Sequence, residues 1–132
     1  QVKGAIYIND SKGTNVGATI AALEGFGTSK PNIHLILGGD GKGADFSPLV
    51  RPVSKYVKNV YLFGADADSL EFILGSEVTC HRHDNLDSIV KAVSSYAQVG
   101  DIVLFSPACA SFDMYRSYVH RGEHFMSLVS SL

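Results

Sequence analysis

A glycine-rich stretch that carries a lysine is the first feature of this sequence that could do chemistry. Glycines at positions 38, 39, 41 and 43 directly follow an apolar run, with Lys42 among them and Asp40 and Asp45 beside it. Ser47 and Pro48 then begin the next periodic segment. A strand, a glycine loop and a helix start place backbone N–H groups where they can face an anion. The stretch therefore predicts an anion-binding site.

Two further polar turns, at 9–15 and 106–111, also follow apolar runs and precede helical patterns. Together the three loops offer ammonium and hydroxyl groups from Lys12, Lys42, Thr14, Ser47 and Ser111. These groups suit a small polyanion that carries carboxylates or phosphates. Each loop by itself is better explained by helix capping and strand termination, but three such loops at the same end of a sheet, two of them with a lysine, favour binding.

Apolar patterns predict alternating strands and helices along the chain. The expected strands cover 4–8, 33–37, 59–63, 77–80 and 101–105, and the expected helices cover 16–26, 48–57, 65–74, 86–96 and 113–132. The expected N-caps are Thr14 or Asn15, Ser47, and Asp84 or Asn85, and Gly122 could interrupt the last helix. The continuously apolar strands are typical of a mostly parallel sheet with helices on both faces, an α/β fold. Ligands of such sheets bind beyond the carboxyl ends of the strands.

Length and composition describe one domain, residues 1–132, of ordinary globular character, with 45% hydrophobic and 18% charged residues. The net charge of -2 gives no reason to expect nucleic acid or a membrane surface as a partner. Neither a membrane-spanning run nor a signal peptide is indicated. Gln1 stands just before the first strand, as in a domain taken from a longer protein. The two cysteines, Cys80 and Cys109, suggest unpaired thiols in a reducing compartment, the cytoplasm.

The glycine loop also allows a nucleotide-binding interpretation. A Walker A loop is excluded, because Gly43 follows Lys42 where Ser or Thr is needed. A dinucleotide fingerprint matches Gly39, Gly41 and Ala44, with Asp66 about 20 residues further along. However, Pro48 places the helix start well after the last glycine of that pattern. A free-standing dinucleotide-binding module is therefore the alternative, and a small interaction domain without a ligand is a third hypothesis.

The histidines and cysteines do not predict a metal site. Cys80, His81 and His83 lie in one short stretch without a second half, which favours a surface loop. His120 and His124 do not form the HExxH arrangement, which favours the surface of the last helix. No catalytic triad can be argued from spacing, because triads are recognised by geometry.

Four motifs together resemble the C-terminal domain of the Mur ligases. They read INDSKGTN at 8–15, LGGDGKGADF at 37–46, LFSPACASFD at 104–113 and RGE at 121–123. The resemblance covers essentially the whole chain. It implies a Rossmann-like domain from a three-domain, ATP-dependent ligase of bacterial peptidoglycan synthesis. The branch it resembles most adds D-glutamate to UDP-N-acetylmuramoyl-L-alanine through an acyl phosphate.

The resemblance also implies roles for single residues. By position, Lys12, Thr14, Lys42 and Ser111 would hold the D-glutamate carboxylates. Tyr118 falls where the family has an aromatic residue that contacts D-glutamate, and Asp10 would reach the ATP ribose. The ATP P-loop and the Mg²⁺ ligands would lie in a central domain upstream, so no catalytic or metal-binding residue is expected here. The isolated domain is expected to be inactive.

Overall fold

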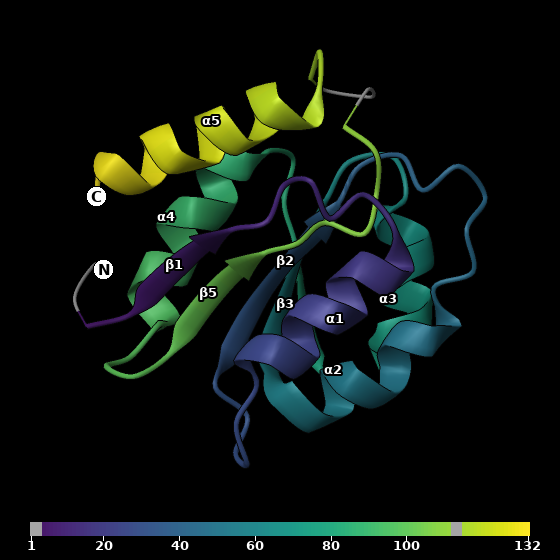
Figure 1. Cartoon of the computed structure of the whole chain (residues 1–132), viewed down its shortest axis with the longest axis horizontal. Coiled ribbons are helices and arrows are strands. Elements are labelled where there is room, and N and C mark those ends of the chain that lie inside the picture. The colour runs from purple at the N-terminus through teal and green to yellow at the C-terminus, as the bar shows by residue number, and fades with distance from the viewer. Residues whose placement is uncertain (1–3, 112–114) are drawn as a thin grey trace.

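Five short segments form one sheet in the computed structural model, which describes residues 4–111 and 115–132 (Figure 1). The strands are β1 (Ile6–Asn9), β2 (Ile33–Gly38), β3 (Val57–Phe63), β4 (Thr79–Arg82) and β5 (Ile102–Phe105). Their order is β1-β5-β2-β3-β4, and every neighbouring pair is parallel. The last strand in the sequence therefore lies between the first two. The predicted α/β fold with a parallel sheet is confirmed.

Helices cover both faces of the sheet, as predicted (Figure 1). One layer contains α1 (Val16–Phe26), the 3-10 turn η1 (Ser47–Leu49), α2 (Val50–Tyr56) and α3 (Ala67–Leu74), and the other contains α4 (Leu86–Tyr96) and α5 (Tyr118–Ser130). On β2, Leu35 and Leu37 pack into the first layer and Ile36 packs into the second. Both faces of β2 are buried, which explains why the strand is apolar throughout.

The helix starts follow the predicted caps at two positions and differ at a third. Asn15 and Asn85 cap α1 and α4, each accepting a hydrogen bond from a backbone N–H three residues later. The predicted cap at Ser47 is wrong, because the residue before η1 is Phe46 and makes no side-chain cap. Asp45 instead accepts a hydrogen bond from the Ser47 N–H at 3.0 Å. Val57, expected at the end of that helix, begins β3.

The fourth strand corrects the surface-loop interpretation of Cys80, His81 and His83. β4 lies two residues beyond its expected position and includes Cys80 and His81, both half-buried. The His81 ring stacks on Tyr61 with centroids 4.9 Å apart. An edge strand pairs on one side only and tolerates polar residues, so its sequence resembles a loop.

The last helix begins later than expected and is continuous. Ser117 caps α5, accepting a hydrogen bond from the His120 N–H. The expected start at 113 lies outside the described residues. Gly122 does not interrupt α5.

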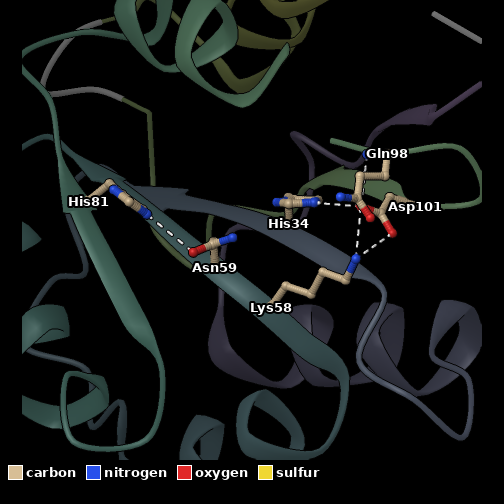
Figure 2. Close-up of polar contacts among 6 residues, drawn as sticks. All are labelled: His34, Lys58, Asn59, His81, Gln98 and Asp101. Carbon is tan, nitrogen blue, oxygen red and sulfur yellow. Dashed lines mark hydrogen bonds and ion pairs between the residues drawn. The ribbon is translucent and has the colours of Figure 1, made fainter. Parts of the chain in front are cut away.

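A buried polar cluster holds the amino ends of three strands (Figure 2). The Asp101 carboxylate accepts hydrogen bonds from His34 Nε2 at 2.9 Å, Lys58 Nζ at 2.9 and 3.1 Å, and the Gln98 N–H at 3.0 Å. Burial alone would raise the pKa of the Asp101 carboxyl, but these hydrogen bonds and the Lys58 charge outweigh it and lower the pKa. The cluster lies at the opposite end of the strands from the three polar loops, so it anchors the sheet away from them.

Candidate functional site at the carboxyl end of the sheet

The three polar loops follow three neighbouring strands. We call them the β1 loop (10–15), the glycine loop (39–46) and the β5 loop (106–111). The N–H of Ala108 donates to the Gly13 carbonyl at 2.9 Å, which joins the β5 loop to the β1 loop. Asp40 and Ala110 exchange two backbone hydrogen bonds of 3.0 and 2.8 Å, which join the glycine loop to the β5 loop. Because β5 lies between β1 and β2, its loop connects the other two.

Glycines are required at the start of the glycine loop, because carbonyl groups of neighbouring segments approach its backbone closely. Gly38 and Gly39 have φ of 148° and 130°, which few side chains tolerate. A Cβ atom on Gly38 would lie 1.9 Å from the Phe63 carbonyl oxygen, and one on Gly39 would lie 2.3 Å from the Ala110 carbonyl oxygen. The glycines therefore allow the loop to pass against β3 and the β5 loop.

Asp66 fixes the same loop from the start of α3. Its carboxylate accepts a hydrogen bond from the Gly41 N–H, and its own N–H donates to the Gly39 carbonyl at 3.0 Å. In the dinucleotide interpretation this carboxylate would bind a ribose. Its hydrogen bond to the glycine loop gives it a structural role instead, so that interpretation is not favoured.

Two residues in these loops have left-handed backbone conformations without being glycine. Lys42 has φ of 53° and Ala108 has φ of 64°. Such conformations cost about 1–3 kcal/mol and persist where the surrounding structure enforces them, often at binding sites. The Asp40 carboxylate accepts a hydrogen bond from the Lys42 N–H at 2.9 Å and supports that turn. The exposed Lys42 side chain projects from a loop whose backbone is held in place.

The side chain of Arg121, in α5, connects the β1 and β5 loops through hydrogen bonds to both. The side chain is 1% exposed. Its Nε donates to Ser11 Oγ at 3.0 Å, its Nη2 to the Ser11 carbonyl at 2.7 Å, and its Nη1 to the Cys109 carbonyl at 3.0 Å. The guanidinium also lies 5.6 Å from the Phe105 ring centroid. Sequence reasoning assigned no role to Arg121, because an arginine in a helix is usually exposed. The adjacent Gly122 was the available signal of a close approach.

The predicted D-glutamate residues divide into two groups. Lys12 and Tyr118 line one groove of about 320 Å³, together with Asn9 and Gly122. Thr14, Lys42 and Ser111 do not line that groove, although the loops that carry them are joined by the backbone bonds described above. Lys12 and Lys42 are exposed, Thr14 is half-buried and Ser111 is 2% exposed.

Asp10 lines a second groove, of about 590 Å³, which Lys12 also lines. Ser106 Oγ donates to Asp10 Oδ2 at 2.7 Å, which holds the carboxylate at the end of β1. A Cβ atom on Gly13 would lie 2.6 Å from that Ser106 oxygen. A carboxylate fixed beside a groove is a suitable acceptor for sugar hydroxyl groups.

The described residues, 4–111 and 115–132, contain no group of three or more metal-ligating side chains. Within the same residues, the helices are all too short or too polar to cross a membrane. Both cysteines carry free thiols.

Comparison with known proteins gives a consistent result. Residues 1–109 match the family described as the Mur ligase, glutamate ligase domain. The chain is 50% identical, over its full length, to the UDP-N-acetylmuramoylalanine--D-glutamate ligase of Legionella pneumophila (strain Lens). Over 96% of its length it is 55% identical to the enzyme of the same name from Coxiella burnetii (strain RSA 331 / Henzerling II). The chain spans 30% and 29% of these two relatives, respectively.

Proposed function

This chain belongs to the Mur ligase, glutamate ligase domain family, and we propose that it binds D-glutamate within a larger peptide ligase. That ligase would join D-glutamate to UDP-N-acetylmuramoyl-L-alanine with ATP, in cytoplasmic peptidoglycan synthesis. The observation that carries the proposal is the joining, at the carboxyl end of one sheet, of three loops that together carry two lysines and several hydroxyl groups. The names of the relatives supply the amino acid and the acceptor.

The chemistry of the predicted residues fits a small amino diacid. Lys12 and Lys42 supply ammonium groups, and Thr14 and Ser111 supply hydroxyl donors. D-glutamate has two carboxylates, which these donors complement through charge-assisted hydrogen bonds. Tyr118, 46% exposed beside Lys12, would cover the aliphatic part of the ligand. The domain would contribute to catalysis by holding the amine near an activated carboxylate, rather than by acid–base chemistry.

Asp10 is our candidate for contact with ATP. Its carboxylate lines the larger groove and fits the hydroxyls of a ribose. ATP would supply the phosphoryl group that activates the acceptor carboxylate. We place the P-loop and the Mg²⁺ ligands in the part of the ligase outside this chain, and we therefore expect no ligation by this chain alone.

Replacing Lys42 by alanine in the full ligase tests the proposal. We expect Lys42→Ala to raise the KM for D-glutamate at least tenfold, because a carboxylate loses its cation, and to leave the KM for ATP within twofold. Lys30→Ala, which removes an exposed lysine from the turn before β2, is the matched control. Steady-state kinetics with each substrate varied in turn gives the answer. An unchanged KM for D-glutamate would remove Lys42 from the site.

A further inference from the structure

A row of polar contacts joins Tyr115 to both helices of the second layer. The Tyr115 hydroxyl lies 2.6 Å from Nδ1 of His124 in α5. Nε2 of the same ring lies 3.3 Å from Oδ1 of Asp87, in the first turn of α4. The three side chains come from separate segments, and their contacts connect those segments.

This geometry fixes the orientation of the imidazole. When the Tyr115 hydroxyl donates to Nδ1, the hydrogen of the neutral ring lies on Nε2 and faces the Asp87 carboxylate. Both ring nitrogens then have partners. The His124 side chain is 32% exposed and that of Asp87 is 59% exposed, so the Asp87 contact contributes little energy. Its effect is to orient the His124 ring, which accepts the hydrogen bond from the Tyr115 hydroxyl.

Tyr115 is connected directly to the proposed ligand residues. Its backbone N–H donates to the carbonyl of the buried Ser111 at 2.8 Å. Its ring packs against the apolar cluster of the second layer and lies edge-on to His120, with centroids 5.2 Å apart. Tyr118 begins α5 three residues later. Tyr115 therefore lies between two residues to which we assign contact with D-glutamate.

We propose that Tyr115 and His124 form a latch that positions Ser111 and Tyr118 for ligand binding. The inference rests on the proposed function, because it concerns the placement of the same D-glutamate residues. Tyr115 is a positioning residue and does not touch the ligand. Without its hydroxyl, Tyr115 would keep its ring contacts with His120 and the apolar cluster, but it would lose its hydrogen bond to His124.

The test combines kinetics with a spectroscopic measurement on the full ligase. Tyr115→Phe keeps the ring and removes only the hydroxyl. We expect a three- to tenfold higher KM for D-glutamate, with kcat and the KM for ATP within twofold. His124→Ala should give a similar increase, and the double variant should be no worse than either, because the two changes break one contact. Tyr96→Phe, which removes a hydroxyl at the far end of α4, is the control.

Nitrogen NMR of ¹⁵N-histidine-labelled ligase measures the latch without any substrate. The His124 signal, assigned from His124→Ala, should show hydrogen on Nε2 in the parent protein and should shift in Tyr115→Phe. An unshifted signal would overturn the latch. A shifted signal with an unchanged KM for D-glutamate would overturn its positioning role. Failure of the binding proposal is detected separately, because Lys42→Ala would then leave that KM unchanged.

Discussion

A single guanidinium group holds two of the three loops at the proposed binding site. Arg121 uses three N–H groups on two carbonyls and one hydroxyl, all from the β1 and β5 loops. In the β5 loop, Ala108 and Cys109 pack into the core, but the β1 loop has no apolar side chain. The position of the β1 loop therefore depends on hydrogen bonds, among them those from Arg121.

At this residue we predict that a conservative change is costly. Arg121→Lys keeps the charge but cannot reproduce the planar fork, and it leaves buried carbonyls without donors. The free energy of unfolding should fall by about 2–3 kcal/mol, measured by urea denaturation of the chain. Arg51→Lys on the exposed face of α2 is the control and should change it by less than about 0.5 kcal/mol. Equal effects of the two variants would show that the fork is not needed.

The single residues show where sequence reasoning succeeds. Lys12, Lys42 and Ser111 could be placed at one end of the sheet because each follows an apolar strand in a polar turn. The role of Arg121 could not be found in this way, and Asp66 was noticed only as part of a dinucleotide fingerprint, because both side chains bind loops that are distant in the sequence. A pattern of residue types does not identify such partners. Whether Lys12, Lys42 and Ser111 contact one ligand stays a prediction.

At the level of elements, α5 and the end of β1 are in unusually close contact. A Cβ atom on Gly122 would lie 2.9 Å from Asn9 Nδ2, 3.0 Å from Asn9 Oδ1 and 3.1 Å from Ser11 Cβ. The Asn9 side chain cannot move away freely, because its Oδ1 accepts a hydrogen bond from the Ser11 N–H at 3.1 Å. Any side chain at 122 would therefore separate the helix from the β1 loop.

Two glycine-to-alanine changes should consequently shift the free energy of unfolding in opposite directions. Gly25 lies within α1, and a Cβ atom there would have no neighbour within 4 Å apart from the backbone of its own helix. Gly25→Ala should stabilise the chain by about 0.5–1 kcal/mol, through helix propensity. Gly122→Ala gains the same propensity but should destabilise the chain by about 1–2 kcal/mol, because it overpacks the contact with Asn9. Urea denaturation of both variants measures the difference, and a stabilising Gly122→Ala would disprove the close contact.

The elements themselves were predictable to differing degrees. Strands β2, β3 and β5 are buried on both faces, so their apolar runs identified them. The predicted position of the edge strand β4 was wrong by two residues, because Thr79, His81 and Arg82 are not apolar. The start of η1 at Ser47 was found from Pro48, but the side chain that accepts a hydrogen bond there is that of Asp45. The hydrogen bond that decides this point depends on the loop conformation, which the residue types do not fix.

For the whole molecule, the Asp101 cluster links stability to pH. The pKa of Asp101 is lowered in the folded chain, and an unfolded Asp has a pKa of about 3.9. The ionised carboxylate therefore stabilises the fold fully above the unfolded pKa. This contribution is lost as the pH falls through the lower, folded pKa.

We predict that Asp101→Asn flattens the acid side of the stability profile. Urea denaturation from pH 7 to pH 3 should give a smaller decline for the variant than for the parent chain. At pH 7 the variant should be less stable by about 1–3 kcal/mol, because Lys58 and His34 lose a charged acceptor. Asp84→Asn, in the turn before α4, should reproduce the parent profile. Parallel profiles for Asp101→Asn and the parent chain would contradict this prediction.

The position of β5 also has a consequence for biosynthesis. In the described sheet β1 is an outer strand whose neighbour is β5, and Ile6 is in register with Ile102. During synthesis on the ribosome, β2, β3 and β4 can pair early. β1 cannot pair until β5, about a hundred residues later in the sequence, has been made. The nascent domain therefore closes in one late, long-range step, and this step also brings the binding loops together.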